Sequence, residues 1–549
     1  MSLHPTDAST IPEETVRVAQ AAFPKGTAYM RMRDALGPLY SDCDFADLFP
    51  RRGQPAESPA RLALVTIMQF AEGLSDRQAA DAVRSRIDWK YALALELTDP
   101  GFDASVLSEF RSRLLTGDAT QFLFERMLEQ LRTQGLLKPH GRARTDSTHI
   151  LAAIRTLNRL ECVGETLRHA LNTLATVAPD WLRSWVPPDW FDRYERRFEE
   201  YRLPPGKAER VALAQQIGVD GNTLLAALHQ PDAPDWLYRV PAVETLRRIW
   251  VQQFVVKADT LEWRSAAELP PSAQLIRSPY DIDARYAKKR QTEWTGYKVH
   301  LTETCEPDLP SLIINVETTE ATRTDYELTS VVHQHLAQHD CLPSEHLVDT
   351  GYLSADQLVS SQQHGIDLVG PVAEENSWQA QAKDGFASTA FVIDWEARQA
   401  RCPQGHVSQK WQEHPGRQGA TMVHFRFSRT DCAVCPVRTR CTRSATLPRS
   451  VTIYPQPAYD ALQSARKRQH TEAFWQQYAP RSGIEGTMAQ GNARADLRHA
   501  RFIGLAKTQL QHVCTALGLN VLRLGAWFAE AKPHTTQHSA FAALAPTAA

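Results

Sequence analysis

The order of strand-like and helix-like segments constrains the fold of this chain more than any other feature. A strand carrying Asp146 is followed by a predicted pair of antiparallel strands, a helix, a short strand that ends at Asp349, another apolar strand, and finally a helix that carries Glu485. The segments between the first and last acid span residues 296–304, 311–319, 326–338, 346–349 and 366–371. This order predicts a mixed α/β core with two acids at strand ends and a third on a helix.

These three acids have the chemistry of a two-metal site. Two divalent cations about 4 Å apart can activate an attacking oxygen and stabilise a leaving one, and Mg²⁺ prefers hard carboxylate ligands. Taken singly, an Asp at a strand end more often caps a turn or pairs with an Arg than binds a metal. Asp146, Asp349 and Glu485 together favour metal-dependent phosphodiester chemistry.

Residues 1–140 are predicted to be helical. Ser58 followed by Pro59 predicts a helix start, and Ser75 with Gln78 has the spacing of a capping box. Short helices joined by tight turns and bearing basic side chains fit a helix-turn-helix domain that binds DNA. The basic residues are Arg77, Arg84, Arg86 and Lys90. A plain helical bundle with a solvated charged face explains the same pattern equally well.

Net charge and hydropathy argue against a chain that is basic throughout and against a membrane-spanning protein. The net charge is −2, so any nucleic-acid surface must come from local clusters of Lys and Arg. The longest apolar runs, such as 62–68, are far shorter than the roughly 20 residues of a membrane span. No signal peptide is recognisable at the N-terminus. We therefore expect a cytoplasmic protein that does not enter a membrane, with cysteines that are free thiols or metal ligands.

Two insertions are predicted within the segment from 141 to 530. Residues from about 152 to 275 are helical and show no chemistry of their own, whereas the insertion from about 372 to 455 is rich in cysteine. Its CysXXCys pair and the more distant ligand types suit a structural zinc site. The five candidate ligands are Cys402, His406, Cys432, Cys435 and Cys441. The alternative is a set of reduced cysteines in a loop-rich insertion. Residues 531–549 are expected to form a disordered tail.

The motif around the last acid gives the most specific signal. Tyr478, Arg481 and Glu485 are spaced as Tyr, two residues, Arg, three residues, Glu. With ThrAspSerThr at 145, GlyTyrLysValHis at 296 and AspThrGlyTyr at 349, the chain resembles bacterial insertion-sequence transposases of the DDE type, most closely the IS1182 family, which is related to the IS4 and IS5 groups. The resemblance implies an RNase H-like catalytic domain behind a helical N-terminal domain.

The resemblance also implies an activity, cofactors and partners. Asp146, Asp349 and Glu485 would be the catalytic triad with Mg²⁺, for which Mn²⁺ can substitute. The enzyme would cut double-stranded DNA at terminal inverted repeats and join the free 3′-OH to target DNA. A homodimer is expected when the two ends are held together, and the protein is expected at the bacterial nucleoid when bound to DNA.

One position departs from the family motif. Related transposases have Lys seven residues after the Glu, whereas this chain has Asn492. The role of the lysine, a contact with a DNA phosphate or base, is either lost or taken by the nearby Arg494. The full set of predicted DNA contacts is Tyr478, Arg481, Arg494, Arg498, Lys288, Lys289, Arg290 and Trp294. Trp294 is proposed to stack on an unpaired base, although a half-buried core position is its alternative.

Two other functions stay open on the sequence alone. A metal-dependent nuclease would share the three acids but would not join the cut end to a target. A non-catalytic helix-turn-helix regulator would bind DNA without needing them.

Overall fold

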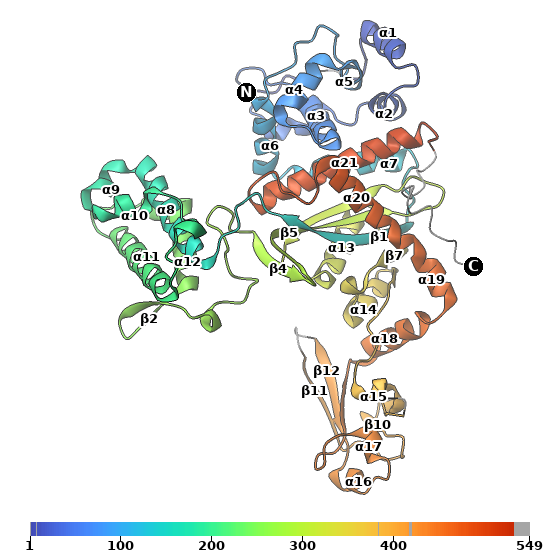
Figure 1. Ribbon diagram of the computed structural model, residues 1–549. Helices are drawn as coiled ribbons and strands as arrows, with labels where there is room; N and C mark the ends of the chain where they lie inside the picture. The colour runs from blue at the N-terminus through green and yellow to red at the C-terminus, as the bar shows by residue number, and fades with distance from the viewer. Residues whose placement is uncertain (1, 7, 383, 417–419, 532–549) are drawn as a thin grey trace, which may run out of the picture.

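The computed structural model describes residues 2–6, 8–382, 384–416 and 420–531. A mixed sheet covered by helices forms the centre of the molecule, a helical unit projects from one side, and a small cysteine-containing unit projects from another (Figure 1). The expected disordered tail lies outside the described residues from 532 onward.

The central sheet has six strands. Strand β1 (Arg142–Leu151) runs antiparallel to β5 (Thr292–Thr304) and parallel to β7 (Glu345–Val348). Beyond β7 lies β8 (Asp367–Val369), again parallel. On the other side, β5 pairs antiparallel with both β6 (Ile313–Glu320) and β4 (Arg285–Lys289). The predicted antiparallel pair is confirmed as β5 and β6, and the mixed α/β fold is confirmed with it.

The register of this sheet brings two of the acids together. Thr145 of β1 is the partner of Val348 in the neighbouring parallel strand β7. The next residues are Asp146 and Asp349, so the two acids lie side by side on neighbouring strands. Asp349 follows the end of β7 as predicted, but Asp146 is in the middle of β1 and not at a strand end, because β1 continues to pair with β5 as far as Leu151.

Helices connect and cover the strands of the sheet. Those after β6 are α13 (Tyr326–Gln338), η5 (Thr350–Tyr352) and α14 (Ala355–Gln363). Those that follow the cysteine-containing unit are α18 (Gln456–Arg468), α19 (Glu472–Tyr478), η8 (Ala479–Ser482), α20 (Gly483–Ala495) and α21 (Leu505–Trp527). Glu485 is therefore in the first turn of α20, as the sequence predicted for a helix-borne acid.

The N-terminal residues form seven α-helices and one 3₁₀ helix in the described part of the chain. They are α1 (Glu13–Ala22), α2 (Ala28–Leu36), η1 (Asp42–Leu48), α3 (Pro59–Glu72), α4 (Asp76–Ser85), α5 (Ile87–Ala92), α6 (Ser105–Thr116) and α7 (Thr120–Thr133). The Ser58 cap and the capping box of Ser75 with Gln78 are both present. Local sequence therefore sets these helix starts.

The N-terminal helices share one hydrophobic core with the sheet, and α21 lies between them (Figure 1). Gly518 and Gly525 of α21 allow close approach, since a Cβ atom at these positions would lie 2.8 Å from the Ala71 nitrogen and 2.5 Å from the Ala28 Cβ. The helical block is thus packed onto the central sheet through a shared core, and only a small cluster around Ala19, Met30 and Tyr91 is separate.

The basic side chains of the N-terminal block mostly serve its internal structure. Arg86 forms ion pairs with Glu72 and Asp88, at 2.6 and 2.8 Å. Lys90 is buried and donates to the carbonyls of Glu96 and Asp99. Arg86 and Lys90 are therefore not available for a DNA-binding face, and for them the helical-bundle alternative is the better account.

The helical insertion has a core of its own (Figure 1). It contains α8 (Arg159–Val177), α9 (Pro179–Trp185), α10 (Asp189–Glu195), α11 (Lys207–Ala227), α12 (Pro241–Gln253) and a hairpin of β2 (Phe254–Lys257) and β3 (Thr260–Trp263). Gly221 of α11 packs against the Trp250 ring, where a Cβ atom would lie only 2.1 Å from the nearest ring atom. The hairpin was not predicted, because its strands are only four residues each.

The cysteine-containing unit follows β8. Its strands are β9 (Val392–Asp394), β10 (Gln399–Arg401), β11 (Lys410–Pro415), β12 (Thr421–Arg426) and β13 (Ser450–Ile453). Its short helices are α15 (Trp378–Gln381), α16 (Arg429–Ala433) and α17 (Arg438–Cys441). Phe425 and Phe391 lie in a small core of its own, so the unit is a separately packed insertion between β8 and α18.

Candidate active site

Asp146, Asp349 and Glu485 meet around a single cation, the guanidinium of Arg481. Its Nη2 lies 2.7 Å from Asp146 Oδ2 and 3.9 Å from Asp349 Oδ2, and its Nη1 lies 3.0 Å from Glu485 Oε1. The fold therefore brings together the three acids from β1, the end of β7 and α20.

The local backbone fixes the two aspartates. Asp146 Oδ1 accepts a hydrogen bond from the Ser147 backbone at 2.8 Å, and Asp349 Oδ1 accepts one from Gly351 at 2.8 Å. Asp349 thereby caps the η5 turn. Glu485 differs, because its side chain is 68% exposed, so this acid is the one that is free to move.

Burial and charge shift the pKa values within the site. The pKa of Asp146 is raised because burial disfavours its charged form, and the nearby Arg481 opposes this shift. Burial alone would lower the pKa of Arg481, but the carboxylates, Asp146 foremost, outweigh it and raise that pKa. The ion pair thus keeps the guanidinium charged at the edge of the sheet.

The donor set suits a hard divalent cation, although Arg481 now supplies the positive charge. Within the described ranges, no group of three or more His, Cys, Asp or Glu side chains is arranged to hold a metal ion. Even so, three carboxylates lie within 4 Å of one guanidinium, and their combined charge exceeds that of Arg481. The three carboxylates therefore fit Mg²⁺, provided that the Arg481 guanidinium moves away from them.

Two further polar residues border the site and were missed in the sequence. Lys298 of β5 forms an ion pair with Asp325 at 3.1 Å, and Asp325 is within 3.4 Å of the Ser147 hydroxyl. The signal was a lysine within an apolar strand, in the GlyTyrLysValHis motif. Asp325 is therefore paired with a lysine and contacts Ser147, whose side chain points to the opposite face of β1 from that of Asp146.

A buried hydrogen bond joins two of the motifs behind the acids. His300 Nδ1, in GlyTyrLysValHis, lies 2.6 Å from the Tyr352 hydroxyl, in AspThrGlyTyr. Both side chains are buried. These motif residues therefore support the site from beneath and do not face the solvent.

Four of the predicted DNA contacts have exposed side chains. Lys289 is the last residue of β4 and Arg290 follows it, and Lys289 is near enough to Asp146 to lower its pKa. Lys288 is paired with Glu293 at 2.5 Å. Arg498 Nε donates to the hydroxyl of Thr148, two residues after Asp146, at 3.3 Å. Lys289 and Arg498 therefore flank the strand that carries the first acid.

Tyr478 and Arg481 are less available than the sequence suggested. The Tyr478 ring is half-buried and stacks on Phe474 at a centroid distance of 5.7 Å. The Arg481 side chain is only 12% exposed and is engaged with the acids. Contact of Arg481 with DNA thus requires it to leave them.

The DNA-contact assignments of Trp294 and Arg494 need correction. Trp294 is only 5% exposed, and its indole donates to the Tyr297 carbonyl. It is a core residue and cannot stack on a base. Arg494 is nine residues after Glu485, about two and a half helical turns, and so points to the opposite side of α20. Asn492, about two turns along, keeps the Glu485 face, so Arg494 does not replace the missing lysine.

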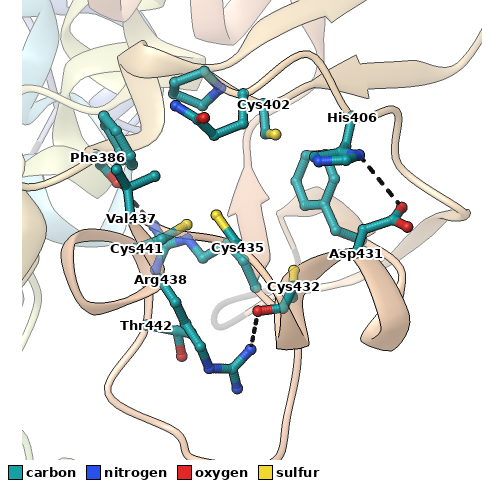
Figure 2. A pocket seen from close by; sticks show the side chains of 14 residues that line it. Phe386, Cys402, His406, Asp431, Cys432, Cys435, Val437, Arg438, Cys441 and Thr442 are labelled. Atoms are coloured by element: carbon teal, nitrogen blue, oxygen red, sulfur yellow. Dashed lines mark hydrogen bonds and ion pairs between the residues drawn. The ribbon is translucent and has the colours of Figure 1, made fainter.

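The four cysteines of the insertion line one small pocket (Figure 2). The cavity is about 30 Å³ and lies between Phe386 and Phe427. Burial, together with the three neighbouring thiols, raises the pKa of Cys441 to about 11. His406 is exposed and turns toward Asp431, with Nδ1 3.7 Å from Oδ2. The cysteines thus gather without a disulfide, whereas His406 stands at the edge.

Comparison with known families adds independent evidence. A model described as a transposase DDE domain matches residues 401–525, and one described as a transposase domain, DUF772, matches residues 17–113. No curated protein and no solved structure matches the chain. Within the described residues, no helix is long and apolar enough to cross a membrane.

Two segments of the chain are therefore similar to transposase domains. A DDE transposase domain implies an RNase H-like fold, and the mixed α/β architecture agrees with it. The two matched domains together are characteristic of the IS1182-family transposases, which confirms the resemblance seen in the sequence.

Proposed function

We propose that this transposase cuts DNA at the ends of its own insertion sequence and joins the cut end to target DNA in a reaction that depends on Mg²⁺. The observation that carries the proposal is the convergence of Asp146, Asp349 and Glu485 on Arg481. An acid within β1, an acid after the end of β7 and an acid on α20 form the donor set that this chemistry requires.

The three acids would hold two Mg²⁺ ions, which when bound activate the attacking oxygen and stabilise the leaving one. Asp146 and Asp349 provide the fixed side of the site, because backbone N–H groups orient both. Glu485 closes it from α20. Arg481, once released from the acids, is placed to neutralise a phosphate of the cut strand.

The reaction consists of two in-line displacements at phosphorus. In the first, a water oxygen forms a bond to phosphorus while the bond to the 3′ oxygen breaks, and this oxygen leaves as a free 3′-OH. In the second, that 3′ oxygen attacks a target phosphodiester and releases a 3′-OH on the target strand. Neither displacement requires a covalent bond to the enzyme.

The decisive experiment is a cleavage assay on duplexes that carry the DNA ends flanking the gene itself. Wild-type protein with Mg²⁺ should nick these ends, and Glu485→Gln should not. Glu209→Gln, an exposed change on α11 of the helical insertion, serves as the matched control and should cleave normally. Near wild-type cleavage by Glu485→Gln would exclude the proposed triad.

The same assay separates the other two functions. A nuclease would cut the ends but leave no joined product when a target plasmid is added. A helix-turn-helix regulator would bind the ends without metal and would nick nothing. The three acids favour either metal-dependent enzyme over the regulator, and the matches to transposase domains favour the transposase over the nuclease.

We also propose a structural zinc ion held by Cys402, Cys432, Cys435 and Cys441. The support is their common pocket with its phenylalanine walls, since Zn²⁺ in structural sites takes four ligands of this type. His406, the fifth candidate, also lines the pocket, but its exposed side chain is turned toward Asp431. Purified protein should contain one zinc per chain by mass spectrometry of metals. Cys435→Ser should lose it, and Cys43→Ser, which changes an exposed cysteine elsewhere, should keep it.

The remaining proposals concern the oligomeric state and the location of the protein in the cell. Two copies are proposed to hold two terminal inverted repeats in one complex, and the protein is proposed to act in the bacterial cytoplasm at the nucleoid. Light scattering of the protein bound to end duplexes should give the mass of two chains and two duplexes. A mass of one chain on one duplex would contradict the dimer.

A further inference from the structure

A fully buried carboxylate links the elements that carry the active site. Glu303 of β5 is completely buried, and its Oε1 accepts from Arg144 Nε at 2.7 Å. Its Oε2 accepts from Arg523 Nη1 at 2.7 Å and from the Thr487 hydroxyl at 2.6 Å. A charge buried this deeply is tolerated only when it is paired and hydrogen-bonded. Both oxygens of Glu303 meet that condition.

Two of the three partners of Glu303 are close in sequence to an acid of the site. Arg144 lies directly opposite Glu303 in the sheet and two residues before Asp146. Thr487 is two residues after Glu485 on α20. Arg523 of α21 also donates to Thr487, at 2.6 Å. The strand with the first acid and the helix with the third are therefore joined through one carboxylate.

Arg144 makes a second link, to the residue before Arg481. Its Nη1 donates to the Pro480 carbonyl. This contact requires a glycine at position 483, because a Cβ atom there would lie 2.0 Å from Arg144 Nη1. Arg144 therefore holds the 480–483 turn that precedes Glu485.

We infer that Glu303, acting through Arg144, Thr487 and Arg523, positions Glu485 and Arg481 relative to Asp146. Glu303 itself touches neither metal nor DNA and is a positioning residue. The inference rests on the proposed function, because it assigns Glu303 a part in assembling that same metal site. Glu485 is mostly exposed, so its place depends on how α20 is anchored.

The expected effect follows from which contacts are lost. Glu303→Gln keeps the size of the side chain but removes its charge, and two arginines are left in the interior without a counter-ion. The 480–487 segment should then relax away from β1. Because the acids no longer converge, the Mg²⁺ concentration for half-maximal cleavage should rise by about tenfold or more.

The test compares Glu303→Gln with Glu165→Gln. Glu165 is an equally buried carboxylate that is paired with Arg168 at 3.0 Å, but it lies in the helical insertion. Both variants should lower the melting temperature. Only Glu303→Gln should shift the Mg²⁺ dependence of cleavage, and end binding without metal should be unchanged in both. A purely structural role would give the two variants the same Mg²⁺ curve as the wild type.

The outcomes distinguish this inference from the proposed function. If the wild-type protein does not cleave the DNA ends that flank its gene, both the proposed function and this inference are wrong. If the wild type cleaves and Glu303→Gln has a normal Mg²⁺ curve, only the positioning role is overturned. Should Glu303→Gln fail to fold, Thr487→Val decides the question: it removes one hydrogen bond to Glu303 and should shift the curve several-fold in the same direction.

Discussion

Arg481 of η8 and Asp146 of β1 are far apart in the sequence, yet they form an ion pair in which Nη2 lies 2.7 Å from Oδ2. The same guanidinium also reaches Asp349 and Glu485. One positive charge is shared by three carboxylates, so the site retains an excess of negative charge that attracts a divalent cation. Arg481 is therefore both a counter-ion for the acids and a competitor for their oxygens.

Removal of this competitor should tighten metal binding. We expect Arg481→Gln to bind Mg²⁺ about tenfold more tightly in the absence of DNA, because a neighbouring charge changes the affinity of a carboxylate for a cation by this order. Calorimetric titration with Mg²⁺ measures it, and Arg498→Gln is the control. Unchanged or weaker binding by Arg481→Gln would mean that the guanidinium does not occupy the metal position.

Asp146→Asn should abolish chemistry and spare DNA binding. The amide keeps the shape of the side chain but is a poor metal ligand, so we expect a loss of at least about 10³-fold in the cleavage rate with Mg²⁺. Single-turnover cleavage of an end duplex measures this rate, and a gel-shift titration measures binding. A loss of binding equal to the loss in rate would instead indicate damage to the fold.

Lys289 should contribute one phosphate contact. We expect Lys289→Gln to weaken end binding and to reduce the slope of log affinity against log salt by about 0.9, the value for one phosphate contact. Lys207→Gln, on the exposed surface of the helical insertion, should leave the slope unchanged. Equal slopes in both variants would remove Lys289 from the DNA interface.

Buried histidines should make the protein sensitive to acid. Burial lowers the pKa of His512 to about 3, so this ring stays neutral in the folded protein, whereas the unfolded chain binds a proton below about pH 6.5. Stability therefore falls as the pH drops from 6.5 toward 3, by up to about 1.4 kcal/mol per pH unit for this one group.

His512→Gln should remove that share of the slope, since an amide can still pair with the hydroxyl of Thr318. Denaturant unfolding at several pH values measures the slope, and the exposed His364→Gln is the control. If the slope of His512→Gln equals that of the wild type, His512 is not the group that titrates.

The secondary structure around two of the acids could be predicted from local patterns. The strand that ends at Asp349 is visible as an apolar run, and the spacing of Arg481 and Glu485 indicated a helix. Parallel pairing of β1 with β7 then places Asp146 and Asp349 side by side. The strand order was therefore sufficient to bring these two residues together.

The interactions of these residues could not be read in the same way. The Arg481 motif indicated a DNA contact, but its ion pair with Asp146 depends on how the turn before α20 packs on β1. Trp294 was misplaced because a basic run precedes it, whereas the pleat of β5 turns the ring inward. Arg494 was misassigned because its spacing of nine residues from Glu485 along α20 puts it on the opposite side of the helix. In each case the side chain's direction depends on the packing of a turn, the pleat of a strand or the position around a helix, and none of these is visible in a local sequence motif.

The position of α21 has a consequence for how the chain is made. This helix comes from the end of the chain, yet it fills the space beside the N-terminal α3. During synthesis on the ribosome, the apolar face of α3 that packs against α21 stays uncovered until residues near 527 have emerged. A product of premature termination would lack α21 and leave that face open, so the N-terminal helices would not survive as a free-standing regulator and would be a substrate for proteases instead.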